Sequence, residues 1–262
     1  MRLAFLRYLG SAIGLLLSLS LLTSKSTFQT ALFLCGETLV WYAIASLSLR
    51  RAVGGAQAGA IPSNALESTA RGSMIGLNAG LNLGLWMLLI PGDLGMLLGL
   101  PLATTGILSG IGPIARSGQY QTALGWASWL MPMSWPVTAL GLLVLVFRVL
   151  TGSIVRMRID GGTGAVETTR GMPRAGFLGG FNLGNFTFLV GVEPTAFSLP
   201  GISAHETAHT LNVAAFGSAW HLLGNAIEQN LPPFRRGVAA YAELLAEGRR
   251  PRPSFPSLSQ WS

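Results

Sequence analysis

The sequence predicts an integral membrane protein with an N-terminal α-helical bundle of four or five transmembrane helices, residues 1–150, followed by a small α+β domain, residues 151–262. Half of the residues are hydrophobic, only 10% are charged and the mean hydropathy is +0.51, whereas soluble domains have about 25% charged residues. Long apolar runs fill the first part. Beyond Thr151, short alternating stretches between glycine-rich turns indicate strands instead.

The first apolar run, Leu3–Leu22, is long enough to cross a bilayer, which takes about 20 residues. Its leading arginines also fit a secretory signal, but Thr23–Ser26 is not a clear cleavage site, so we expect a retained anchor. The second span, Phe28–Leu49, contains Glu37. An acid within a span usually faces protein or water, and we interpret this one as a paired or snorkelling side chain, with a proton or substrate path as the alternative.

The third span, Ser73–Ile90, presents one face of small residues. Glycine recurs at every fourth position just before and along this span, at Gly72, Gly76, Gly80 and Gly84. Such a face lets another helix approach closely. We expect this partner to be a helix of the same chain, and a second copy of the chain is the alternative.

Two more apolar stretches complete the helical part. Leu94–Ala115 is interrupted by proline and glycine, so it either spans or re-enters the bilayer, and Trp135–Leu150 is the last span. Five spans would place the C-terminal domain outside, whereas three basic residues near the end of the last span favour the inside: Arg148, Arg156 and Arg158. The side therefore stays open, and a plasma membrane of the bacterial type is the expected location.

The formal charge of +7 comes from 17 basic and 10 acidic residues. No basic run is interleaved with aromatic residues, which argues against nucleic-acid binding. Topology signals and contact with anionic lipid account for the charge, so the lipid bilayer is an expected partner. Cys35 is the single cysteine, and the chain therefore forms no internal disulfide.

The C-terminal part should begin with a hairpin. Ser153–Ile159 and Ala165–Thr169 read as its strands, and Asp160-Gly161-Gly162 supplies the turn. Phe177–Val190 adds short strands punctuated by glycine. We expect three helices after them and then an extended tail rich in proline and serine, Arg249–Ser262.

All three histidines of the chain lie within 17 residues, and two of them form the motif HExxH with His205, Glu206 and His209. Residues four apart on a helix share a face, so the two imidazoles can bind one metal ion. Glu206 then lies beside that ion, where it can accept a proton from a water molecule. The motif therefore predicts a metal site on this helix.

A second and a third helix follow the motif. Gly217 and Ser218 are suited to end one helix and begin the next, which carries three polar residues at helical spacing: His221, Asn225 and Glu228. Folding back on the short turn could bring this polar stripe to face the motif. The third helix, near residues 237–247, bears Glu243 and Glu247. We expect these two to form a solvated or helix-pairing face, with a role as an alternative ligand or a support of the metal site as the lesser possibility.

HExxH followed by a glutamate after eighteen intervening residues resembles the zinc site of gluzincin metallopeptidases, in particular their aminopeptidase branch, over residues 203–228. The resemblance implies one Zn²⁺ held by His205, His209 and Glu228, with Glu206 as general base. His221 is the alternative third ligand, or with Asn225 it hydrogen-bonds to the developing oxyanion. The family also commonly sets an edge strand beside the metal helix, where the backbone of a peptide substrate can pair.

The functional hypothesis is a membrane-bound zinc-dependent metallopeptidase that cleaves protein or peptide substrates near the membrane surface. A non-enzymatic structural subunit of a membrane complex is the alternative, because buried His, Asn and Glu can form a hydrogen-bond network without metal. A small-solute transporter is the third hypothesis. It depends on polar residues within the spans: Glu37, Asn78 and Asn82.

Overall fold

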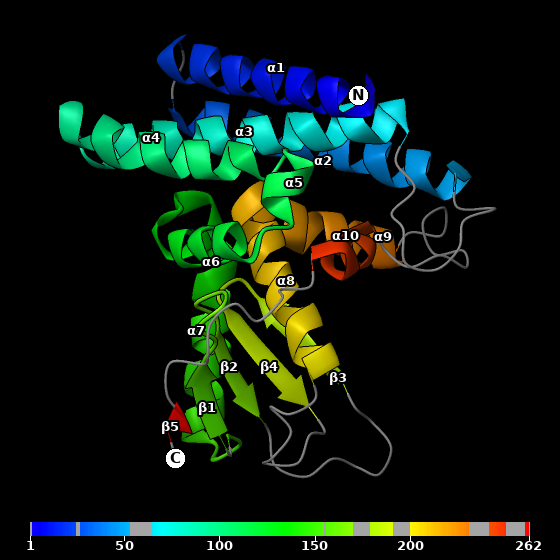
Figure 1. The fold of residues 1–262 in the computed structure, drawn as a ribbon. Coiled ribbons are helices and arrows are strands. Elements are labelled where there is room, and N and C mark those ends of the chain that lie inside the picture. The colour runs from blue at the N-terminus through cyan, green and yellow to red at the C-terminus, as the bar shows by residue number, and fades with distance from the viewer. Residues whose placement is uncertain are drawn as a thin grey trace.

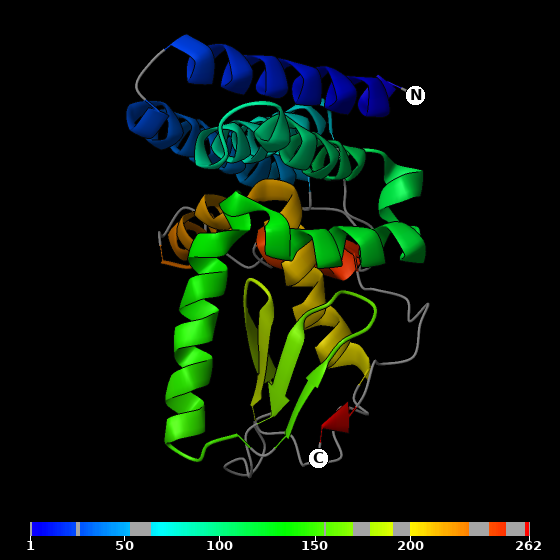
Figure 2. The ribbon, with the colours of Figure 1, turned by 90° about the vertical axis from the view of Figure 1, so that its left-hand side faces the viewer.

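The computed structural model describes residues 2–24, 27–52, 64–154, 156–169, 179–190, 200–230, 241–249 and 260–261. Four long helices form one layer, seen at the top of Figures 1 and 2. They are α1 (Arg2–Ser24), α2 (Thr27–Ala52), α3 (Ala65–Leu89) and α4 (Asp93–Leu108). The remaining helices and a small sheet lie below this layer in both views.

Helix α3 lies at the centre of the layer and packs against α1, α2 and α4. Its glycine face meets α1: a Cβ atom at Gly72 would lie 2.1 Å from the carbonyl oxygen of Arg7, and one at Gly76 would lie 2.0 Å from that of Ser11. Only glycine permits this approach of two backbones. The small-residue face is therefore occupied by a helix of the same chain.

Within the described residues, three helices are long and apolar enough to cross a membrane: Arg2–Ser20, Ala65–Leu89 and Pro132–Leu150. The apolar stretches of α2 and α4 are shorter. The third candidate contains α7 (Trp135–Leu150), which runs crosswise to α1–α4 in both views of the ribbon (Figures 1 and 2). Helix α7 therefore does not extend the layer, as a simple bundle of four or five spans would require, but packs against strands β3 and β4.

Short elements connect the layer to α7. They are α5 (Gly112–Ala115), α6 (Gly118–Ala127) and two 3₁₀ turns, Ser128–Leu130 and Pro132–Ser134. The junction is made by two asparagines near the middle of α3. Asn78 Nδ2 donates to the carbonyl oxygen of Ala214 (2.9 Å), and Asn82 Oδ1 accepts from the backbone N–H of Met133 (3.0 Å). These side chains therefore join the layer to the part that lies beneath it.

The sheet has the strand order β3-β4-β2-β1-β5. Its strands are β1 (Arg156–Ile159), β2 (Val166–Thr169), β3 (Gly179–Leu183), β4 (Phe186–Val190) and β5 (Gln260–Trp261). The predicted β1–β2 hairpin is confirmed, with Ile159 opposite Val166. Strands β2 and β4 are parallel, whereas β3 and β4 are antiparallel around Gly184, which has a positive φ of 68°.

Helices α7 and α8 (Pro200–Phe216) cover opposite faces of this sheet. Successive side chains of a strand point to opposite faces. On β3, Phe181 stacks on Phe188 beneath the Arg148 guanidinium of α7, and the next residue, Asn182, donates to Thr210 of α8 (3.0 Å). One face of the sheet thus packs against α8, the helix that carries HExxH.

Helix α8 ends at Phe216, and Gly217 follows with a φ of 87°, as the sequence predicts. The second predicted helix is not regular: it begins with a π-helical turn, Trp220–Gly224, and continues as α9 (Asn225–Asn230). The third is α10 (Tyr241–Arg249). Apart from α10's last residue and β5, the predicted tail lies outside the described residues.

Candidate metal centre

Two helices bring three potential ligands to one point. Helix α8 presents His205 and His209 one turn apart, and α10 presents Glu243 opposite them. The Oε2 atom of Glu243 lies 2.8 Å from His205 Nε2 and 3.5 Å from His209 Nε2. All three ligand atoms lie within 4.8 Å of one another. This group could hold a metal ion.

The donor set and its spacing fit zinc. In a tetrahedral site with ligands 2.0–2.2 Å from the ion, neighbouring ligand atoms lie about 3.4 Å apart, and the separation of 3.5 Å between Glu243 Oε2 and His209 Nε2 matches this value. Two imidazoles and one carboxylate are also a common set for catalytic zinc. Among the described residues no fourth histidine, cysteine or acid joins the group, so a coordination position would stay open. Open positions are typical of catalytic sites, whereas structural ones usually have four protein ligands.

Electrostatics favour an anionic Glu243. Burial raises the pKa of its carboxyl, but the hydrogen bonds with His205 and His209 and the charge of these rings outweigh burial, so the pKa falls below its ordinary value. An ionised carboxylate between two imidazole Nε2 atoms is the state that a cation requires.

Glu206 lies beside the ligands on α8, with 7% of its surface exposed. Its side chain packs on strand β3, where a Cβ atom at position 180 would lie 2.8 Å from Glu206 Cγ and 3.1 Å from Oε1. Gly180 therefore makes room for the carboxylate. Burial raises the pKa of Glu206, while the neighbouring His209 and His205 lower it in part. A carboxylate with a raised pKa is a better proton acceptor near neutral pH.

His221 lies next to the group without joining it. Its ring centre is 5.7 Å from that of His209, and its Nε2–H donates to the carbonyl oxygen of Asn182 on β3 (3.1 Å). Burial, and then the charge of His209, lowers the pKa of His221 to about 4, so the ring is neutral at pH 7. Because Nε2 is the donor, Nδ1 is an acceptor, and it has no partner in the described part of the chain.

Glu228 is the main correction to the sequence-based site. It is 2% exposed, and its carboxylate accepts hydrogen bonds from Tyr42, from Ser46 (2.7 Å) and from the backbone N–H of Tyr241 (2.8 Å). It therefore lies on the far side of α10 from the histidines. The reason is the π-helical turn: one extra residue per turn rotates the rest of the helix by about 100°, so Glu228 no longer shares a face with His221.

The third potential ligand in this group is Glu243, which stands 34 positions after His209. The sequence predicts Glu243 on a solvated or helix-pairing face, with a role as an alternative ligand or a support of the metal site as the lesser possibility. The available signal was an acid on a helix after the motif, without any spacing rule to select it. The side chain of Asn225 lies outside the described residues, and its role stays a prediction.

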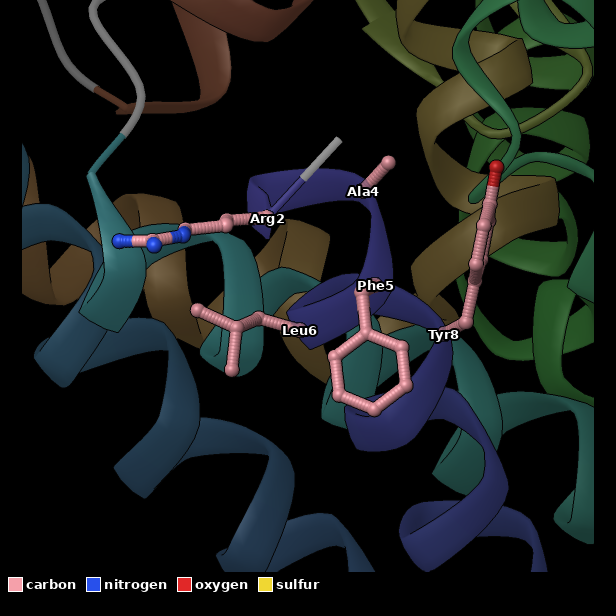
Figure 3. Close-up of a pocket in the computed structure, with 5 residues that line it drawn as sticks. All are labelled: Arg2, Ala4, Phe5, Leu6 and Tyr8. Atoms are coloured by element: carbon pink, nitrogen blue, oxygen red, sulfur yellow. The ribbon is translucent and has the colours of Figure 1, made fainter.

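A separate hollow lies on the outer surface of the helical layer. Figure 3 shows it at the start of α1, lined by Arg2, Ala4, Phe5, Leu6 and Tyr8. No histidine, cysteine or acid lines it, and Phe5 is 64% exposed there. This surface has the chemistry of a lipid contact and belongs to a different part of the molecule from the metal centre.

Comparisons with models of protein families, with curated proteins and with solved structures find no match to this chain. Function must therefore be inferred from the residues of the site itself.

Proposed function

We propose that this protein is a membrane-associated zinc metallopeptidase in which His205, His209 and Glu243 hold one Zn²⁺ and Glu206 is the general base. One observation carries the proposal: two Nε2 atoms and a carboxylate from separate helices converge within 4.8 Å, with a second carboxylate beside them on the same helix. The three apolar helices support association with a bilayer.

Each residue has a distinct chemical task. Zinc at this position would polarise a water molecule and the substrate carbonyl. Glu206, with its raised pKa, accepts the proton of the attacking water and then delivers it to the leaving amine. His221 is neutral and hydrogen-bonded to β3, and it fills the space beside His209 without adding a charge.

Strand β3 suits an extended peptide substrate. It lies at one edge of the described sheet, paired with β4 alone. The Asn182 carbonyl accepts from His221, which lies outside the sheet, so this carbonyl points away from β4. The backbone groups of Gly180, two positions earlier, point the same way, next to Glu206. An unfolded protein segment could therefore pair with this edge and present a peptide bond to the site.

Metal content tests the proposal directly. The full-length protein, purified in detergent and dialysed against buffer with micromolar zinc, should contain about one zinc per chain by elemental analysis. The double variant His205→Ala, His209→Ala should contain none, because a lone carboxylate binds zinc weakly. A wild-type protein that retains no zinc would contradict the proposal.

The general base is tested separately. Glu206→Gln keeps the shape of the side chain but cannot accept the proton, so cleavage of unfolded casein should fall by about 10³-fold. Zinc content should stay at the wild-type level, since Glu206 is not a ligand. Normal turnover in this variant would show that another group is the base.

A structural polar core is the second candidate, and one contact favours it. The His205–Glu243 hydrogen bond of 2.8 Å already pairs the two side chains without an ion. In that case the wild-type protein would bind no zinc, and the double alanine variant would lose stability without any change in metal content.

A further inference from the structure

Helix α10 has two functional faces. Residues two apart on a helix are separated by roughly 200° around its axis, so Tyr241 and Glu243 project from nearly opposite sides. Glu243 faces the histidines of α8. Tyr241 is 1% exposed and packs with Tyr42 and Trp220 in the core beneath the helical layer.

Two buried carboxylates hold Tyr241 in this place. Its hydroxyl donates to Glu67 Oε1 on α3 (2.9 Å), and its backbone N–H, at the first turn of α10, donates to Glu228 Oε2 (2.8 Å). Glu67 is fully buried and paired with Arg71 (3.0 Å). Glu228 is fixed in turn by Tyr42 and Ser46 of α2. Together these hydrogen bonds tie Tyr241 to α2 and α3.

We propose that Tyr241 is a positioning residue that sets Glu243 at the metal centre, and that Glu67 and Glu228 act through it. The proposal rests on the proposed function, because it assigns Glu243 as a zinc ligand. Helix α10 has nine residues, which is too short to be stable alone in water, so contacts with the rest of the protein must place it. Glu228, which the sequence suggests as a ligand, here caps the helix that supplies the ligand.

The consequence is a coupling between the apolar helices and the metal. With both anchors in place, Glu243 is already near the two imidazoles before zinc arrives. Without them, zinc binding must also order α10, and this cost appears as a lower affinity.

The test compares two tyrosine-to-phenylalanine variants of the full-length protein. Tyr241→Phe removes the hydrogen bond to Glu67. Tyr120→Phe is the matched control, because Tyr120 is also largely buried and donates to a backbone oxygen, that of Thr105 (2.6 Å), away from α10. Zinc affinity is measured by chelator competition, the coordination geometry by the visible absorption of the Co²⁺-loaded protein, and stability by thermal unfolding without metal.

Tyr241→Phe should weaken zinc binding by about tenfold and change the Co²⁺ spectrum, whereas Tyr120→Phe should lose stability without either effect. Glu228→Ala should weaken zinc binding as well. Glu228→Gln should restore it, because the amide oxygen still accepts from Tyr42 and from the Tyr241 N–H while the amide nitrogen faces Ser46.

The outcomes separate the two proposals. If the wild-type protein binds zinc and Tyr241→Phe behaves like Tyr120→Phe in affinity and spectrum, the positioning role is wrong and the proposed function stands. If the wild-type protein binds neither zinc nor Co²⁺, both fail together. If Tyr241→Phe does not fold, equal zinc affinity in Glu228→Ala and the wild type overturns the positioning role.

Discussion

Two carboxylate clusters adjoin α10, and they differ in how their hydrogen-bonding capacity is used. On the side of α2 and α3, Glu67 and Glu228 accept hydrogen bonds at both carboxylate oxygens. On the side of α8, Glu243 shares one oxygen between two imidazoles, and the Nδ1 atoms of His209 and His221 have no partner within the described residues.

The two clusters also differ in exposure: Glu67 and Glu228 are buried, whereas the side chain of Glu243 is 34% exposed. A carboxylate whose two oxygens both accept hydrogen bonds from protein donors is held in the fold by those donors. Ligand atoms that converge with coordination capacity remaining are typical of a functional site. By this criterion we assign Glu228 to the fold and propose Glu243 for the metal site, although both follow HExxH in the chain.

The largest expected effect comes from a comparison of one conservative substitution in each cluster. Glu243→Gln replaces a charged ligand by a neutral amide, so zinc affinity should fall by about 100-fold or more. Glu228→Gln keeps an oxygen for the donors around it, so the affinity should stay within about threefold of the wild type. Chelator competition on both full-length variants measures the two constants.

The reverse ranking would decide against this assignment. If Glu228→Gln lost zinc and Glu243→Gln retained it, the ligand set implied by the gluzincin resemblance would hold and the placement of α10 would be wrong. Equal losses in both variants would indicate that the anchor network and the metal site are one cooperative unit.

Local rules predicted a good part of this structure. The HExxH pair on one helical face, the stop at Gly217, the β1–β2 hairpin around Asp160-Gly161-Gly162 and the use of the glycine face of α3 within the chain all follow from spacing or turn chemistry over a few residues. Such patterns act over short distances, so the sequence alone suffices to recognise them.

The features that the sequence did not predict share a different cause. Glu243 reaches the site because α10 packs between α8 and the helical layer. No local spacing in the sequence encodes that packing. The π-helical turn at Trp220–Gly224 changed the phase of a segment that a regular helix would have kept in register. The crosswise position of α7 was equally hidden, because length and hydropathy predict whether a helix can span, not the direction in which it runs.

Lowering the pH should destabilise the metal-free protein through His221, and this effect is of intermediate size. Its pKa in the folded protein is about 4, below the ordinary 6.5, so the unfolded chain binds the extra proton between these values. Stability from this group is therefore complete above pH 6.5 and is lost as the pH falls toward 4. Between pH 7 and pH 5 the metal-free protein should lose about 2 kcal/mol of unfolding free energy from this source.

His221→Gln is the matched variant, because its amide can still donate to the Asn182 carbonyl but does not titrate. Chemical denaturation in detergent at pH 7 and pH 5 should give a smaller loss for this variant than for the wild type, by about the same 2 kcal/mol. An identical pH dependence in both proteins would mean that His221 is not buried in its neutral form.

The smallest expected effect concerns Gly180, where the sheet meets the proposed base. A methyl group at this position would lie 2.8 Å from Glu206 Cγ, and since Glu206 is the flexible partner, its carboxylate should shift while the strand stays in place. A displacement of this kind should lower kcat for casein by about tenfold, because catalysis depends steeply on the position of the base. Zinc content should not change, since Gly180→Ala touches no ligand.

Gly106→Ala on α4 is the control, because a Cβ atom there would meet nothing closer than 3.9 Å. If Gly180→Ala kept full activity, Glu206 would not need its place against β3, and the edge strand would lose its proposed link to the chemistry.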